Sequence, residues 1–85
     1  MQSFDYVIRD EAGLHARPAG LLVRKAKDFS GCVVLSANGR ECDATRLMAL
    51  MGMCIKSGSA VTVTVSGEGE EAFARELEEF FRENL

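Results

Sequence analysis

The residues best suited to chemistry lie in one short stretch, 13–19, with the sequence Gly-Leu-His-Ala-Arg-Pro-Ala. This stretch holds the only histidine of the chain, His15, and the only proline, Pro18. Because proline fixes φ and lacks an N–H, it suits the first turn of a helix. His15 would then sit at the helix start, where the free backbone N–H groups of Ala16 and Arg17 and the helix dipole attract anions.

Arg17 adds a second reason to expect an anion here, because its guanidinium fork matches the oxygens of a phosphoryl group. Neutral imidazole is a nucleophile, and the N–P bond that it forms stays reactive. The stretch therefore predicts a place that can hold a phosphoryl group on His15. The alternative is an ordinary surface or core histidine with no chemical role.

Hydrophobic spacing predicts the elements that must position this stretch. We expect strands at 3–9, around 33–35, at 40–43 and at 61–66, and helices from 16 to about 28, from 45 to about 54 and from about 70. Asp43 or Thr45 is the expected cap of the second helix. The order of these elements predicts a two-layer α+β domain, with helices on one face of a four-stranded sheet.

The Asn38-Gly39 pair predicts a type I′ turn between the second and third strands. Such a hairpin places Cys42 opposite Leu35 and leaves Cys32 well away from Cys42, so a disulfide between these two cysteines is not expected. With one histidine and no Cys-x-x-Cys spacing, a metal site is not expected either. We interpret the three cysteines as reduced, small hydrophobic residues.

Length and composition indicate a single domain over residues 1–85, 47% hydrophobic and 27% charged. No apolar run is long enough to span a bilayer, and the N-terminus does not resemble a secretion signal, so we expect a cytoplasmic protein. Residues 1–59 hold eight basic and six acidic residues, whereas 60–85 hold two and seven. A mildly basic half around His15 suits acidic protein partners but is too weak for nucleic acid.

The motif at 13–19 resembles the active-site motif of HPr, the histidine phosphocarrier family of the bacterial sugar phosphotransferase system. The chain length, the Asn38-Gly39 turn and the run Leu47-Met48-x-x-Met51 are also similar to that family. The resemblance implies an open-faced β-sandwich, βαββαβα, with an antiparallel sheet. It further implies that enzyme I phosphorylates His15 at Nδ1, that Arg17 contacts the phosphate, and that IIA domains receive the phosphoryl group. The protein would then be a monomeric carrier without a cofactor, and not an enzyme.

A carrier must present a surface to its partners. At helical spacing, Leu47 and Met51 share one face and Met48 lies beside it. With Gly20 and Leu21 they would form an apolar collar beside His15, and the resemblance places both kinds of partner in this region. The remaining candidates for partner contact are the basic residues Arg24 and Lys27. The alternative is that the methionines are plain core, although Leu50 already gives this helix an inward face.

Many HPr proteins carry a regulatory serine where this chain has Arg46, and Thr45 is one residue out of register. We therefore expect no regulation by serine phosphorylation. Two alternatives to the carrier are a regulatory module that only binds proteins and a nitrogen-related paralogue. Retention of both His15 and Arg17 favours the carrier, because a pure binder needs neither residue.

Overall fold

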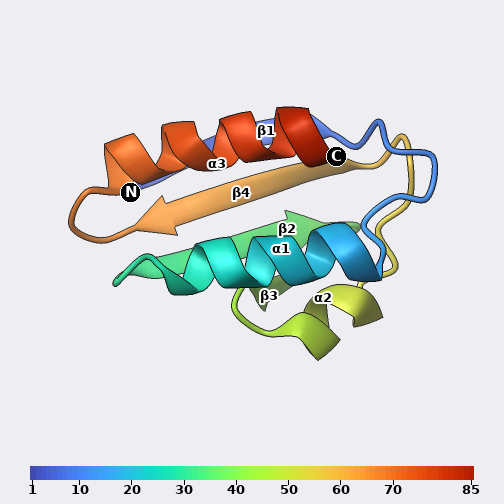
Figure 1. The fold of residues 1–85 in the computed structure, drawn as a ribbon, viewed down its shortest axis with the longest axis horizontal. Coiled ribbons are helices and arrows are strands. Elements are labelled where there is room, and N and C mark those ends of the chain that lie inside the picture. Colours follow the sequence, from blue (N-terminus) through green and yellow to red (C-terminus); the bar gives the residue numbers. More distant parts are fainter.

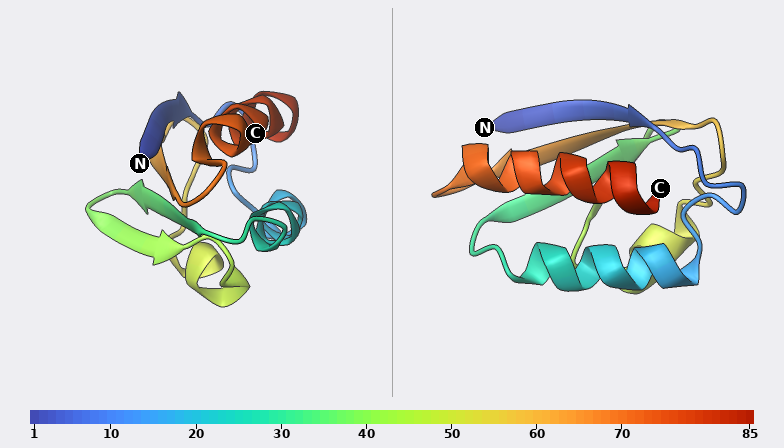
Figure 2. Two further views of the ribbon diagram at one scale, coloured as in Figure 1. Left: turned by 90° about the vertical axis from the view of Figure 1, so that its left-hand side faces the viewer. Right: turned by 45° about the horizontal axis from the view of Figure 1, so that its top comes forward.

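The computed structural model describes all residues from Met1 to Leu85 and shows four strands and three helices in the expected order (Figure 1). The elements are β1 (Gln2–Val7), α1 (Ala16–Lys27), β2 (Cys32–Ala37), β3 (Arg40–Asp43), α2 (Leu47–Gly52), β4 (Ala60–Ser66) and α3 (Glu70–Asn84). The sheet has the strand order β1-β4-β2-β3, with every neighbouring pair antiparallel. Both views in Figure 2 show the helices on one side of the sheet, which confirms the expected open-faced sandwich.

The sheet separates a buried face from an open one by strict alternation along β4. Val61, Val63 and Val65 are buried against the helices, whereas Thr62 and Thr64 lie half-buried on the open face. The β-branched valines fit a pleated surface that is buried on one side. Because β4 pairs with both β1 and β2, it holds the centre of the sheet.

The hairpin between β2 and β3 has the predicted turn and register. Asn38 and Gly39 have φ values of 54° and 75°, and two positive φ angles in a two-residue loop define a type I′ turn. Cys42 is paired with Leu35, as the turn requires. Cys42 is half-buried against the core, with its Sγ 3.2 Å from Sδ of Met53, and burial is the main cause that raises the pKa of its thiol.

The other two cysteines lie at the surface. Cys32 and Cys54 are exposed and free, so neither adds its small hydrophobic side chain to the core. Cys32 is the first residue of β2, and its side chain lies on the open face of the sheet. Cys54 follows α2 with a φ of 51°, in the left-handed region, and is exposed.

All three helices contribute to one hydrophobic core of 20 residues. Leu22 of α1, Leu50 of α2 and Leu77 of α3 are fully buried over the sheet. Phe81 of α3 is also fully buried, and its ring meets those of Phe4 and Tyr6 edge to face at 5.8 and 5.6 Å between centroids. Burying each of these side chains contributes roughly 1.5–3 kcal/mol to folding. None of the helices has the length and apolar run needed to cross a membrane.

The second helix is shorter than expected, and its predicted cap is wrong. The α2 helix begins at Leu47, and its cap residue is Arg46, whose side chain makes no capping hydrogen bond. The carboxylate of Asp43 instead accepts hydrogen bonds from the backbone N–H and the hydroxyl of Thr45, at 2.9 and 2.7 Å. These bonds form a local turn before the helix, and they are the main reason that the pKa of Asp43 lies below its ordinary value.

Candidate functional site

The structure places His15 at the N-cap of α1, in the extended conformation with φ −91° and ψ −176°. Its carbonyl oxygen accepts the N–H of Ala19 at 3.0 Å, which closes the first helical turn. Its side chain makes no capping hydrogen bond and is 42% exposed. The imidazole is therefore held at the helix end by the backbone alone and is open to solvent.

Two unpaired donors lie next to this imidazole. The first-turn N–H groups of Ala16 and Arg17 have no helical acceptor, and no turn or cap bond satisfies them. Pro18 has no N–H to offer, and that of Ala19 is already bonded. Together with the positive end of the α1 dipole, these groups can bind an anion carried by His15.

The loop that leads into His15 is tied to the loop after α2. Leu14 donates its N–H to the carbonyl of Ile55 at 2.9 Å. Gly13 lies against the same segment with a φ of 69°, and a Cβ at this position would collide with the Ile55 carbonyl and lie 2.8 Å from Cα of Lys56. Glycine is therefore required here both for the backbone conformation and for the close approach.

His15 opens into a surface hollow of about 300 Å³. The hollow combines residues of three segments: Asp10 from the loop after β1, the N-cap His15 with Arg17, Pro18 and Leu21 of α1, and Glu83 and Asn84 from the end of α3. The predicted pair of His15 and Arg17 is thus brought together in one hollow. Asp10, Glu83 and Asn84 were not predicted as site residues.

The end of α3 reaches the site through backbone hydrogen bonds. The carbonyl oxygen of Leu85 accepts the N–H groups of Arg9 and Asp10, at 2.6 and 2.8 Å. These bonds link residues that are far apart in the sequence, so no local pattern could reveal them. For Asp10 a local signal does exist. An aspartate shortly before a glycine favours a turn in which its carboxylate accepts the backbone N–H of the residue two positions later, here Ala12.

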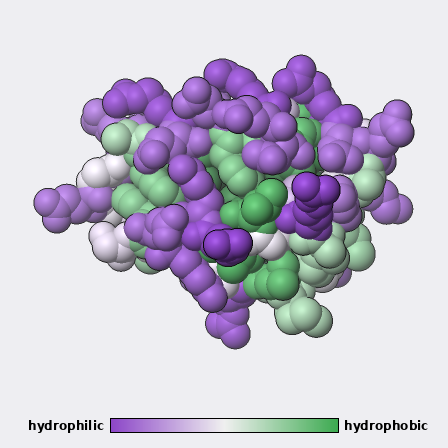
Figure 3. Space-filling view, in the orientation of Figure 1, coloured by the Kyte–Doolittle hydropathy of each residue, from purple (hydrophilic) through white to green (hydrophobic).

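The candidate partner residues divide into exposed and half-buried groups. Leu21 on α1 is 40% exposed, and Leu47 and Met48 on α2 are 41% and 82% exposed. Met51 instead is half-buried and packs against the core. Because α1 and α2 pack together, the exposed residues lie on adjoining elements, and Figure 3 shows hydrophobic surface over this region.

The rest of the predicted partner surface lies on α1. Arg24 and Lys27 are exposed. Gly20 is half-buried, with open space around the position of a Cβ, so nothing within the fold requires glycine there. Because Gly20 has no side chain, no atoms project from α1 at this position.

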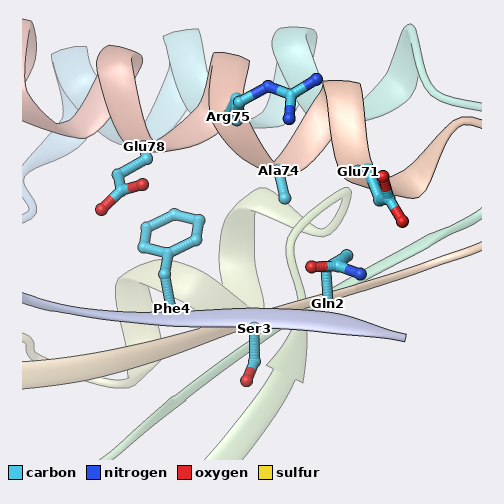
Figure 4. A pocket seen from close by; sticks show the side chains of 7 residues that line it. All are labelled: Gln2, Ser3, Phe4, Glu71, Ala74, Arg75 and Glu78. Atoms are coloured by element: carbon cyan, nitrogen blue, oxygen red, sulfur yellow. The ribbon is translucent and has the colours of Figure 1, made fainter.

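A second hollow, of about 220 Å³, lies between β1 and α3 (Figure 4). It is at the opposite end of the molecule from His15, near the start of both elements (Figure 1). Arg75 lies between Glu71 and Glu78 along the helix side of this hollow, and the Ser3 side chain points away from α3. The hollow thus lacks the combination of a nucleophile and free anion-binding donors that is found at His15.

Comparison with known proteins agrees with this geometry. The family model described as "PTS HPr component phosphorylation site" matches residues 2–83. The phosphocarrier protein HPr of Mycoplasma capricolum is 37% identical over 67 residues, which cover 79% of this chain and 75% of that protein. A solved structure of a histidine-containing phosphocarrier protein from Mycoplasma has a TM-score of 0.92 at 29% identity, over 96% of this chain and 93% of the other.

A third relative is the HPr-like protein Crh of Bacillus subtilis. It is 33% identical over 78 residues, which cover 92% of each chain. Its crystal structure is described as an intertwined, domain-swapped dimer and has a TM-score of 0.76 at 32% identity, over all of this chain and 98% of the other.

The fold and the site define a class of small α+β proteins that carry a histidine at an anion-attracting helix N-terminus. Within that class, this chain belongs to the HPr family of the phosphotransferase system, which includes the phosphocarrier protein of Mycoplasma capricolum.

Proposed function

We propose that this protein is a cytoplasmic, single-domain phosphocarrier, which accepts a phosphoryl group from phospho-enzyme I on His15 and passes it to sugar-specific IIA domains. The observation that carries the proposal is the exposed imidazole at the start of α1, beside two unpaired N–H groups and the Arg17 side chain. A phosphoryl group on this imidazole would meet backbone donors, a guanidinium and the positive end of a helix dipole.

The transfer needs no general base from this chain. The lone pair of Nδ1, the nitrogen that family membership implies, attacks phosphorus while the bond from phosphorus to the donor nitrogen breaks. The electron pair of that bond returns to the donor imidazole. The reverse exchange delivers the phosphoryl group to an acceptor. The chain supplies the nucleophile and the electrostatic stabilisation, and the partners supply the rest of the site.

We expect this protein to take up acid-labile phosphate from phosphoenolpyruvate when enzyme I and Mg²⁺ are present. His15→Ala removes the nucleophile and should abolish the uptake, whereas the fold should persist because the His15 side chain is half-exposed. Radiolabel incorporation and a thermal melt measure the two effects. Label retained by His15→Ala, or no label on the wild-type protein with a cognate enzyme I, would contradict the proposal.

The similarity to Crh favours a second candidate, a regulatory protein-binding role. The description of Crh links that protein to catabolite repression. In this chain Arg46 occupies the position of the regulatory serine of many HPr proteins, and the hydroxyl of Thr45 is bonded to Asp43. A nitrogen-related paralogue would retain His15 and transfer phosphoryl groups to other acceptors. Phosphate labelling that depends on His15 is expected of the sugar phosphocarrier and of the nitrogen-related paralogue, but not of a protein that only binds partners.

We also propose that the protein acts as a monomer, although the Crh structure is a dimer. In this chain β1 pairs along its whole length with β4 of the same molecule. Sedimentation at micromolar concentration measures the oligomeric state directly.

Met48→Glu should weaken complex formation with enzyme I by about tenfold or more while changing the free energy of unfolding by no more than about 0.5 kcal/mol. Met48 is 82% exposed, so the new carboxylate stays in water in the free protein. In a complex the same carboxylate would be buried without a partner. Met51→Glu is the matched comparison, because Met51 packs against the core and its substitution should lower the melting temperature. A destabilised Met48→Glu, or unchanged binding, would contradict the assignment of Met48 to the partner surface.

A further inference from the structure

We propose that Asp10 is a positioning residue that orients the His15 imidazole by facing its Nε2–H, so that Nδ1 is left free for the phosphoryl group. The proposal deepens the phosphocarrier function and rests on it. Oδ2 of Asp10 lies 3.8 Å from Nε2 of His15, and both residues line the same hollow. Asp10 is the only carboxylate within ion-pair distance of the ring.

The position of the Asp10 carboxylate is determined by three hydrogen bonds. Its backbone N–H donates to the carbonyl of Leu85 at 2.8 Å, and its own carbonyl accepts the N–H of Gly13 at 2.9 Å. Its Oδ1 accepts the N–H of Ala12, also at 2.9 Å. One carboxylate oxygen is therefore occupied by the loop, and the other, Oδ2, is left to face the ring.

A carboxylate at this place selects one tautomer of the neutral ring. Ionised aspartate only accepts hydrogen bonds, so it favours a proton on the facing nitrogen, Nε2, and a lone pair on Nδ1. The separation of 3.8 Å is a charge contact and not a direct hydrogen bond. It therefore biases the ring without immobilising it.

The same contact assists the transfer step. When Nδ1 bonds to phosphorus and the donor N–P bond breaks, the ring keeps its Nε2 proton and becomes cationic. Asp10 then offsets that positive charge on one side of the ring, while the phosphoryl oxygens meet the start of α1. Arg17 from α1 and Glu83 from α3 line the hollow as well, but neither makes an ion pair with the ring.

Two substitutions of Asp10 distinguish orientation of the ring from support of the loop. In Asp10→Asn, the side-chain oxygen can keep the bond from Ala12, which places the NH₂ group where Oδ2 was. A donor beside Nε2 favours a lone pair there and moves the proton to Nδ1, which blocks the nucleophile. In Asp10→Ala the bond to the loop is lost, but no donor faces the ring.

Orientation therefore predicts that asparagine harms transfer more than alanine does. We expect the rate of phosphoryl transfer from enzyme I to fall about tenfold in Asp10→Asn. The loss is smaller than for a buried catalytic histidine in the wrong tautomer, because solvent screens the contact at this half-exposed site. For Asp10→Ala the expected loss is about two- to fivefold. A merely structural role predicts the opposite order. Glu11→Gln removes the same charge from an exposed neighbour outside the hollow and should leave the rate unchanged.

The tautomer can be measured without any partner. The ¹⁵N shifts of His15 in the unphosphorylated protein, above the titration range of imidazole, should show mainly Nε2–H in the wild type and more Nδ1–H in Asp10→Asn. An unchanged tautomer ratio, or alanine slower than asparagine, would overturn the proposal. A wild-type protein that accepts no phosphoryl group would overturn the proposed function instead, and the ¹⁵N measurement would still decide on the orienting contact.

Discussion

Gly13→Ala should lower the free energy of unfolding by about 2–5 kcal/mol, which is a large change for one methyl group. Two costs combine in this estimate. The φ of 69° places any L side chain in the left-handed region, and the added Cβ would collide with the Ile55 carbonyl beside Cα of Lys56. These are all backbone atoms, which cannot move aside as the end of a flexible side chain could. Urea denaturation of both proteins measures the difference.

The same substitution at another glycine of this region is the matched control. At Gly20, in α1, a Cβ meets nothing within 4 Å. Gly20→Ala should therefore stabilise the protein by about 0.5–1 kcal/mol, because alanine loses less backbone freedom than glycine in a helix. If Gly13→Ala were as stable as the wild type, the close approach of the two loops would not exist in solution.

Arg17→Ala should slow phosphoryl transfer by roughly tenfold to a hundredfold and leave the melting temperature unchanged. A charge-assisted hydrogen bond to phosphate contributes about 1.5–3 kcal/mol, and its loss in the transition state gives that range of rates. Arg17 is exposed and lines the hollow at His15, so removing its side chain opens no cavity. Rapid-quench measurement of transfer from phospho-enzyme I gives the rate.

Two further variants test whether the effect belongs to the guanidinium fork. Arg17→Lys keeps the charge but offers a point donor in place of the fork, so its rate should fall between those of wild type and Arg17→Ala. Arg75→Ala removes an exposed arginine from the opposite end of the molecule and should transfer at the wild-type rate. Equal rates for Arg17→Ala and the wild type with every partner would place this arginine outside the mechanism.

The elements that the sequence predicts best are those with strong local signals. The valine and threonine alternation of β4, the type I′ turn at Asn38-Gly39 and the start of α1 at the proline motif all agree with the structure. In each case the side chains themselves dictate the conformation, through pleated packing, positive φ or a fixed φ. The start of α2 was misjudged because Asp43 and Thr45 bond each other instead of the helix end.

The candidate site was half visible in the sequence. His15 and Arg17 lie two positions apart in one motif, so residue types and spacing alone could predict that they lie together at the start of a helix. The residues that α3 adds to the hollow could not be predicted from the sequence, because Glu83 and Asn84 reach it only when α3 packs across β1 and β4. The contact between Asp10 and His15 depends on a loop whose shape is set by backbone bonds to Leu85 and Gly13.

The central place of β4 also bears on how the chain folds. Thr62 of β4 donates a hydrogen bond to Asp5 of β1, across 57 residues of sequence, and the other neighbour of β4, strand β2, precedes it in the chain as well. The β2–β3 hairpin can form early, since its strands are joined by two residues. Pairing β4 with β1 and β2 instead closes long loops, and the entropy lost in closing them slows this step. During synthesis on the ribosome, the edges of β1 and β2 that pair with β4 therefore stay unpaired until β4 has emerged. Strand edges left unpaired in that interval can pair with another chain.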